Sequence, residues 1–429
     1  MLLIYTQKVT PRITYSFKHI CTGILKIPVT FTSKIEEFIA HEGMKISYGK
    51  QSLGNEIFIQ SVDLLQEQGF ADVEFKVQDW EGTPCFFTVS EKSSIPFDIF
   101  AASFYLLTRY EEYSPHVKDE QGRFPASESL AFREDFLNLP VVDIWAYKFR
   151  NLLQERFPEN VFPVRKRQIH NVISVTEAFC YRKKGIVRAV IGFLVDLIQF
   201  KIKYVVDRVQ VMMNFKKDPF DNYTGIIKFL KKYRISLKFM FQVSDFSTHD
   251  RNINHNRLEF QSLIKSVADY AEVGLLLGYY ANQKMKVLKN EKLRLESILK
   301  RSIESGMNSK YNLLLPDTYN HMAELEFRND YSMGYPEAVG FRAGTCSPFL
   351  FYDINFEVTT PLQVHPYAIS IQALEGIKEN EIKSRIAEIK RNINNVDGNL
   401  IAVYTNEDFS EYSNAKRNYE ILKNINEIK

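Results

Sequence analysis

The chain has little cysteine and no paired cysteine motif. Its four cysteines, Cys21, Cys85, Cys180 and Cys346, are scattered over 429 residues, and no two of them form a C-x-x-C pair. A zinc knuckle and a thiol redox motif are therefore excluded, because each needs closely spaced cysteines. The absence of a cysteine framework also predicts a reducing compartment.

Long hydrophobic runs are absent as well. The N-terminus begins MLLIY, but Lys8, Pro11 and Arg12 interrupt it before an apolar stretch of signal-peptide length is reached. The segment richest in apolar residues, 189–215, contains five charged residues and cannot span a bilayer. We therefore predict no transmembrane segment and a cytoplasmic location. The segment is either an interfacial helix or a helix packed on the surface of its domain, and we favour the packed helix.

Charge of one sign is not in excess. The chain has 55 basic and 52 acidic residues and a net charge of +3, so we predict no nucleic-acid partner. The eight histidines form neither H-x-x-x-H nor H-E-x-x-H, and no Gly-x-Ser-x-Gly elbow or Walker loop occurs. Aromatic residues are abundant, at 14%, and we expect them to fill the core rather than to stack on sugars.

Strand-like and helix-like segments alternate along most of the chain, which predicts an α/β fold with a mainly parallel sheet. A polar stretch with two prolines, 155–168, is predicted to link two domains, 1–160 and 166–429. In the second domain, strands are expected at 171–175, 237–243, 273–277 and 400–404.

Two further local patterns predict individual elements. Val73, Phe75 and Val77 alternate with polar residues, which is typical of a half-buried strand in the first domain. A helix is expected over 219–233, with Asp218 as its N-cap and a proline at its first position.

Two loops in the C-terminal half carry the most specific motifs of the chain. The sequence DYSMGY spans residues 330–335, and GFRAGTCSPF spans residues 340–349. Both loops resemble the corresponding stretches of the bacterial polysaccharide deacetylases, the NodB-homology carbohydrate esterases. The resemblance implies a deformed (β/α) barrel over 166–429. Active members of that family hold a divalent metal with one Asp and two His.

The first domain carries a second resemblance. Its segments 95–113, 122–125 and 140–145 are similar to an N-terminal module that accompanies deacetylase-like proteins of Bacteroidetes-type bacteria. This similarity implies a small α/β module over 1–160, with a role that the residues do not reveal.

The positions that supply metal ligands and catalytic groups in the deacetylases carry other side chains here. The matched residues are Ser174, Thr176, Leu276, Ser309 and Thr405. Glu177 is the neighbour of Thr176, but adjacent side chains on a strand point to opposite faces. None of the matched side chains replaces a His or Asp ligand, and Thr cannot act as a general acid near neutral pH. The resemblance therefore implies a lost metal site, no cofactor and no catalytic residue.

A set of ligand-binding candidates remains. In the family, the Arg of the Phe-Arg-Ala-Gly-Thr motif pairs with the catalytic Asp, which is missing here. We therefore expect Arg342 to pair with Asp330 or with an anionic ligand. A turn-rich corner that only builds the fold is an equally weighted alternative. The candidates are Asp330, Tyr331, Arg342, Thr345, His365 and Asn406.

Two functions follow from these observations. We favour a non-catalytic, deacetylase-like protein that binds a glycan or amino-sugar ligand, or that is an accessory in envelope polysaccharide metabolism. The alternative is an active carbohydrate hydrolase or deacetylase with a displaced metal or acid-base site. His249, Asp250 and His255 share one loop after a predicted strand and are candidates for such a site. Paired carboxylates for glycoside hydrolysis also remain open, because their separation is spatial.

Overall fold

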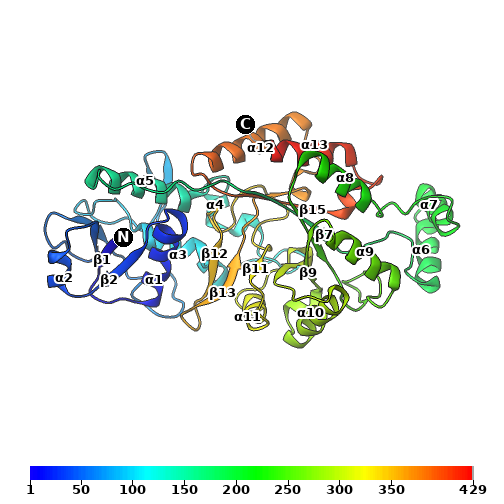
Figure 1. Ribbon diagram of the computed structural model, residues 1–429, viewed down its shortest axis with the longest axis horizontal. Coiled ribbons are helices and arrows are strands. Elements are labelled where there is room, and N and C mark those ends of the chain that lie inside the picture. Colours follow the sequence, from blue (N-terminus) through cyan, green and yellow to red (C-terminus); the bar gives the residue numbers. More distant parts are fainter. Residues whose placement is uncertain (428–429) are drawn as a thin grey trace. The chain divides into compact units, whose positions relative to one another are not determined.

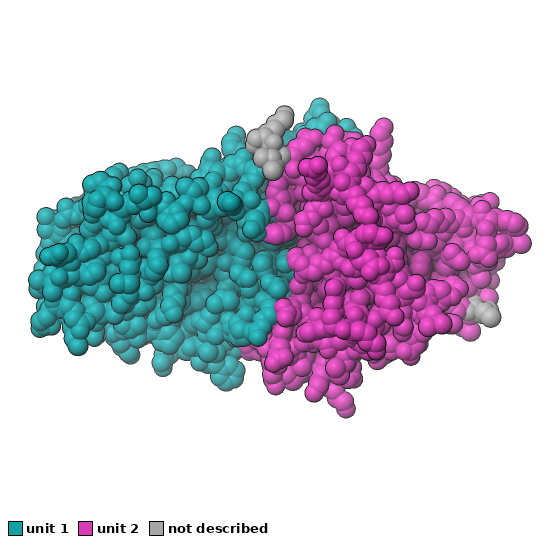
Figure 2. Space-filling view, in the orientation of Figure 1, with its two compact units in different colours: residues 1–168, 328–401 teal, residues 169–327, 402–429 magenta. Residues whose placement is uncertain are grey.

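The computed structural model describes residues 1–427, and of Ile186 it describes only the backbone. The chain forms two compact units, each made of two separate stretches of sequence (Figure 2). Unit 1 comprises residues 1–168 and 328–401, and unit 2 comprises residues 169–327 and 402–429. Residues 328–401 therefore pack with the N-terminal part of the chain. The division into 1–160 and 166–429 stays a prediction.

A four-stranded sheet forms the N-terminal part of unit 1. Its strands are β1 (Leu2–Tyr5), β2 (Val29–Thr32), β3 (Lys45–Gly49) and β4 (Ile57–Gln60). The order is β2-β1-β3-β4, and every pairing is parallel. The central strand places Ile4 opposite Phe31 on one side and Ile46 on the other, and both isoleucines are fully buried.

Helices and short turns of helix complete this part of unit 1. They are α1 (Pro11–Phe17), the π-helix η1 (Lys18–Ile24), α2 (Ile35–Ala40), α3 (Ile99–Leu107), α4 (Leu130–Arg133), α5 (Val141–Arg156) and α12 (Glu379–Asn394), with the 3-10 turns η2 (Tyr110–Tyr113), η3 (Ala126–Glu128) and η6 (Gln372–Leu374). Helix α3 begins at Ile99 because the Asp98 carboxylate accepts the backbone amides of Phe100 and Ala101. It ends before Arg109, which has a left-handed backbone.

The remaining strands of unit 1 are short. They are the antiparallel pair β5 (Gln78–Trp80) and β6 (Thr83–Cys85), then β11 (Asn329–Asp330), β12 (Phe349–Asp353), β13 (Val358–Val364) and β14 (Ile369–Ser370). Strand β13 pairs antiparallel with β12 and parallel with β11. The strand predicted around Val73, Phe75 and Val77 is wrong. Those residues form no strand, and the Phe75 ring instead packs on Phe86 and Phe87, with centroids 4.7 and 4.9 Å away.

A parallel sheet forms the centre of unit 2 (Figure 1). Its strands are β7 (Ile169–Val175), β8 (Leu237–Phe241), β9 (Glu272–Leu277), β10 (Ser305–Asn308) and residues 402–405 of β15 (Leu400–Thr405). The order is β10-β9-β8-β7-β15, and β7 to β10 pair in parallel. The four strands predicted for this region are confirmed to within two residues, and so is the mainly parallel sheet. Closure into a barrel stays a prediction.

The other elements of unit 2 are helical. They are α6 (Ile186–Ile198), α7 (Ile202–Met212), α8 (Tyr223–Tyr233), α9 (Leu258–Ala268), α10 (Met285–Leu299), α11 (Asp317–Glu324) and α13 (Ala415–Asn426), with the 3-10 turns η4 (Tyr279–Asn282), η5 (Ser309–Tyr311) and η7 (Asn406–Phe409). Within residues 1–427, no helix is both long and apolar enough to cross a bilayer.

The helix predicted over 219–233 exists, but Asp218 is not its N-cap. Helix α8 begins four residues later, at Tyr223. The buried Asp218 carboxylate instead accepts four backbone amides, from Cys180, Tyr181, Arg182 and Phe220, at 2.7 to 3.0 Å. Four donors compensate a buried charge better than the single bond of a cap, so Asp218 holds the loop after β7.

Candidate functional site

Arg342 pairs with a carboxylate, as predicted, but Asp330 is the wrong partner. Arg342 is 2% exposed and lies in the loop between β11 and β12. Its Nε and Nη2 donate to the two Glu112 oxygens at 2.9 and 2.7 Å, the two-pronged geometry that a guanidinium prefers. Its Nη1 donates to the Gly334 carbonyl at 3.3 Å. Asp330 instead accepts the Ser332 amide and hydroxyl, at 2.9 and 2.5 Å.

A second arginine makes this ion pair part of a buried cluster of four charges. Arg109 Nε donates to Glu112 at 2.7 Å, and Arg109 Nη2 lies 2.7 Å from Glu111 and 3.0 Å from the Tyr335 hydroxyl. Arg109 Nη1 donates to the Arg342 carbonyl. Burial raises the pKa of Glu112, but the charges of Arg342 and Arg109 outweigh it, so this pKa lies below its ordinary value. Two positive and two negative charges therefore compensate each other inside unit 1.

Thr345 is engaged in the same way. Its hydroxyl donates to the buried Asp143 carboxylate at 2.6 Å. Asp143 also accepts the Ser347 hydroxyl at 2.5 Å, the Cys346 amide at 3.0 Å and Arg165 Nη2 at 3.0 Å. The loop that carries the predicted ligand residues thus wraps around one side chain of α5.

These contacts give the loop 340–349 a structural role. Gly340 and Gly344 have positive φ angles of 143° and 62°. A Cβ on Gly340 would lie 2.4 Å from the Leu137 carbonyl, and one on Gly344 would lie 2.7 Å from Leu106. Glycine is required at both positions because the N-terminal segment approaches the loop so closely. The loop joins the two stretches of unit 1, and each guanidinium nitrogen of Arg342 donates to a protein oxygen.

The other three candidates are also in contact with protein groups. The rings of Tyr331 and His365 stack, with centroids 4.8 Å apart, and His365 Nε2 lies 2.9 Å from Asn329 Oδ1. Asn406 belongs to unit 2, where its Nδ2 donates to the Glu177 carbonyl at 3.0 Å. Five of the six candidates therefore lie in unit 1. Ligand binding by any of the six stays a prediction.

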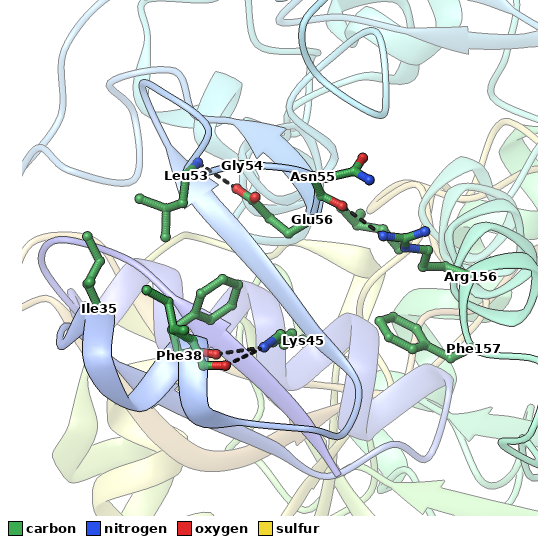
Figure 3. A pocket seen from close by; sticks show the side chains of 11 residues that line it. Ile35, Phe38, Lys45, Leu53, Gly54, Asn55, Glu56, Arg156 and Phe157 are labelled. Atoms are coloured by element: carbon green, nitrogen blue, oxygen red, sulfur yellow. Dashed lines mark hydrogen bonds between the residues drawn. The ribbon is translucent and has the colours of Figure 1, made fainter.

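Unit 1 also contains a cavity of about 350 Å³ (Figure 3). Its apolar walls are Ile35, Phe38, Ile39, Leu53, Ile57 and Phe157. The cations beside it are engaged with the walls, because Lys45 Nζ donates to the Phe38 carbonyl at 2.9 Å and Arg156 Nη2 to the Asn55 carbonyl at 2.8 Å. The cavity is therefore an apolar hollow without a reactive group aimed into it.

Unit 2 gathers a different set of groups at the carboxyl ends of its parallel strands. Gln242 follows β8, and its Nε2 donates to Asp250 Oδ1 at 2.6 Å. Asp250 Oδ2 also accepts the backbone amide of Tyr279, which lies just beyond β9, at 3.0 Å. Glu291, from α10, accepts the amide of Gly278 at 2.9 Å. The carboxyl ends of parallel strands are where α/β proteins place their sites.

Asp250 and Glu291 form a buried carboxyl pair, each 2% exposed. A Cβ on Gly278 would lie 2.6 Å from Glu291 Oε1 and 3.1 Å from Asp250 Oδ2, so both groups converge on this glycine. Burial, with the charge of Asp250 in addition, raises the pKa of Glu291 to about 8. Burial also raises the pKa of Asp250. Glu291 therefore keeps its proton near pH 7, and a perturbed pair of this kind is typical of a functional site.

Buried oxygens without hydrogen-bond donors lie in the same region. In the described part of the chain, Gln242 Oε1, Asn282 Oδ1, Ser309 Oγ and Asn312 Oδ1 have no hydrogen-bond partner. Asn282 Nδ2 donates to the Asn312 carbonyl at 2.9 Å, so η4 and η5 are in contact. A buried acceptor without a donor costs about 1–3 kcal/mol. The three amide oxygens therefore need a donor from a water molecule or a ligand, and the Ser309 hydroxyl needs a donor or an acceptor.

The residues matched to the deacetylase metal site do not fit a divalent metal. Ser174 Oγ donates to the Tyr404 carbonyl at 3.2 Å, and Leu276 is a buried apolar side chain. Across residues 1–427, no three His, Cys, Asp or Glu side chains are grouped to hold a metal ion. The loop histidine His249 stacks on Tyr279, with ring centroids 3.8 Å apart.

Sequence reasoning identified Asp250 but missed Glu291, Asn282 and Asn312. One signal for Glu291 was present. It occupies the inward stripe of α10 with Leu288 and Leu295, where a lone carboxyl group among apolar residues is unusual. The two asparagines have no such signal, because asparagine in a loop is common.

Comparison with known proteins gives a family-model match for part of the chain and distant structural similarity over about 61% of it. Residues 2–158 match a family of unknown function, DUF7033. A search of curated proteins found no match. Similar solved structures include a polysaccharide deacetylase from Bacillus cereus, with 10% identity, a TM-score of 0.31, and coverage of 61% of this chain and 87% of that one.

Two other similar structures have different activities. A CE4 family pseudoenzyme from Bacillus anthracis shows 7% identity and a TM-score of 0.31, over 61% of this chain and 60% of that one. A 4-alpha-glucanotransferase from Thermococcus litoralis shows 11% identity and a TM-score of 0.37, over 61% of this chain and 36% of that one. At these values the similarity carries no conclusion about the chemistry of this chain.

Proposed function

We propose that the chain is a non-catalytic, polysaccharide-deacetylase-like protein that binds a glycan or amino-sugar oligomer at the carboxyl ends of β8, β9 and β10. The observation that carries the proposal is the set of buried oxygens without donors, Gln242 Oε1, Asn282 Oδ1, Ser309 Oγ and Asn312 Oδ1. Sugar hydroxyl and acetamido N–H groups donate hydrogen bonds, and amide oxygens accept hydrogen bonds from either group.

The neighbouring side chains support the same ligand class. Tyr279 and Tyr280 lie beside the amide groups, and Tyr280 is partly exposed, so a ring face is within reach of a sugar. The protonated Glu291 adds a neutral hydrogen-bonding carboxyl group rather than a charge. By contrast, Arg342 and Thr345 in unit 1 are held by Glu112 and Asp143. An accessory role in envelope polysaccharide metabolism and a cytoplasmic location belong to the same proposal.

Calorimetric titration with a chitin-type oligomer tests the proposal. Asn312→Ala removes one acceptor, which is worth about 0.5–1.5 kcal/mol, so we expect the affinity to fall about two- to tenfold. Because the removed Asn312 Oδ1 is buried and has no donor, the free energy of unfolding should stay the same or rise. Asn290→Ala, on the exposed face of α10, is the matched control and should bind like the wild type. Equal affinity for Asn312→Ala and the wild type would refute the site.

A second candidate function is an active carbohydrate hydrolase, which the Asp250–Glu291 pair favours. A protonated Glu291 could act as general acid and Asp250 as general base. Against it, Asp250 is held by Gln242 and the Tyr279 amide. We expect no acetate release from acetylated amino-sugar oligomers above the uncatalysed rate, with or without zinc or cobalt. Turnover that disappears in Glu291→Gln would replace the binding proposal by this one.

A further inference from the structure

Two neighbouring helices of unit 2, the hairpin α6–α7, expose an extensive apolar surface. The helices contact each other and lie side by side (Figure 1). Among the described side chains of residues 187–213, only Ala189, Asp207 and Val211 are buried. The exposed apolar residues of α6 are Val187, Val190, Ile191, Leu194, Val195, Leu197 and Ile198. Those of α7 and its C-terminal end are Ile202, Val206, Val209, Met212 and Met213.

These residues recur every three or four positions, so each helix presents an apolar stripe to solvent. We expected this segment to pack on its own domain, and that expectation is wrong for the stripe. Soluble proteins rarely leave so large an apolar surface uncovered, and such a surface marks an interaction site.

The charge around the stripe indicates the partner. Residues 182–217 contain nine basic and two acidic residues. Both acids are neutralised within the segment, because Asp196 pairs with Arg208 at 2.6 Å and Asp207 with Lys216 at 2.7 Å. Lys183, Lys184 and Lys217 pair with acids outside the segment, Glu259, Glu177 and Asp221. The remaining positive charge is carried by Arg182, Arg188, Lys201 and Lys203, and it favours a partner with negative charge.

The turn between the two helices combines the strongest apolar and basic features. Phe200 is 85% exposed and Ile198 is 74% exposed. Lys201 and Lys203, which flank Ile202, are exposed as well. Apolar side chains at a tip with lysines directly beside them match the boundary between lipid headgroups and acyl chains.

Other partners fit these features less well. A second copy of the chain would bring two positively charged hairpins together, which costs energy by like-charge repulsion. Spanning a bilayer needs about 20 apolar residues, whereas α6 has 13 and α7 has 11. A bilayer surface, however, can bury an apolar stripe without shape complementarity, and anionic headgroups attract lysine and arginine.

We infer that the hairpin α6–α7 docks the protein on an anionic lipid surface, with Ile198, Phe200 and Ile202 entering the headgroup boundary and Lys201 and Lys203 contacting phosphates. This inference is independent of glycan binding, because it uses none of the residues at the strand ends.

Vesicle co-sedimentation of the full chain tests the inference. One set of vesicles contains equal amounts of phosphatidylglycerol and phosphatidylcholine, and the other contains phosphatidylcholine alone. We expect binding to the anionic vesicles that weakens with salt and falls strongly on the neutral ones. Phe200→Asp should reduce the partition coefficient about tenfold. Lys201→Gln and Lys203→Gln should each reduce it about fivefold.

Phe356→Asp is the matched control, because Phe356 is 77% exposed but belongs to unit 1 and not to the hairpin. It should bind like the wild type, and circular dichroism should show that every variant is folded. Absence of wild-type binding to anionic vesicles, or unchanged binding by Phe200→Asp, would overturn the inference. A wild-type dimer that Phe200→Asp converts to a monomer in sedimentation velocity would assign the surface to a second copy instead.

Discussion

The arginine–glutamate cluster of unit 1 and the strand-end groups of unit 2 use buried polar groups in different ways. In the cluster, every guanidinium nitrogen of Arg342 and Arg109 donates to a protein oxygen. In unit 2, amide oxygens such as Asn312 Oδ1 have no donor, and Glu291 keeps a proton near neutral pH. A satisfied network makes a fold rigid and unique, whereas an unsatisfied one leaves capacity for a ligand. The loop 340–349, which most resembles an enzyme motif, therefore has a structural role in unit 1. The buried groups without partners lie at the strand ends of unit 2, where the resemblance to the enzyme motifs is weakest.

The largest expected effect is the loss of an ion pair in unit 1. Arg342→Ala leaves Glu112 buried with less compensation, and we expect the free energy of unfolding to fall by about 3–5 kcal/mol. Urea denaturation measures this change. Lys34→Ala is the control within the same unit, because the Lys34–Glu37 pair is exposed and screened by solvent, so its loss should change stability little. Similar losses for the two variants would remove the structural role assigned to Arg342.

The carboxyl pair of unit 2 should give the next largest effect, as a dependence of stability on pH. The folded pKa of Glu291 is raised to about 8, above its unfolded value, so its contribution is full below the unfolded pKa and is lost as pH rises toward 8. Glu291→Gln cannot ionise. We expect its stability relative to the wild type to rise by about 1.4 kcal/mol per pH unit, or roughly 3 kcal/mol between pH 5 and pH 7.

Urea denaturation of both proteins at several pH values measures this difference. A difference that does not change with pH would show that Glu291 has an ordinary pKa, and the contrast between the units would then rest on the amide oxygens alone.

Thr345→Val should have the smallest of the three effects. The substitution keeps the side-chain volume but removes the hydrogen bond to the charged Asp143 and the acceptor of the Ser347 amide, so we expect a loss of about 2 kcal/mol. Affinity for a chitin-type oligomer should be unchanged, and calorimetry of this variant checks it. Reduced affinity without a change in stability would return Thr345 to the ligand site that the sequence suggested.

The parallel sheet of unit 2 was predictable because strand-like and helix-like segments alternate along the chain and because β8, β9 and β15 are largely apolar. The partner of Arg342 was not, since Glu112 is 230 residues away in sequence and Asp330 was favoured only by its proximity. The strand predicted from the alternation at Val73, Phe75 and Val77 is wrong for another reason. Phe75 packs in an aromatic cluster and not in a strand. Local patterns predict elements, whereas buried polar pairings depend on contacts that only the folded chain defines.

Hydrogen–deuterium exchange with and without a chitin-type oligomer tests the contrast between the units most directly. We predict protection on binding in residues 242–252, 278–282 and 308–312, which carry the strand-end groups of unit 2. We predict no change in residues 330–345, where Arg342 and Thr345 already have partners. Protection confined to residues 330–345 would contradict this assignment and place the ligand at the loop of unit 1.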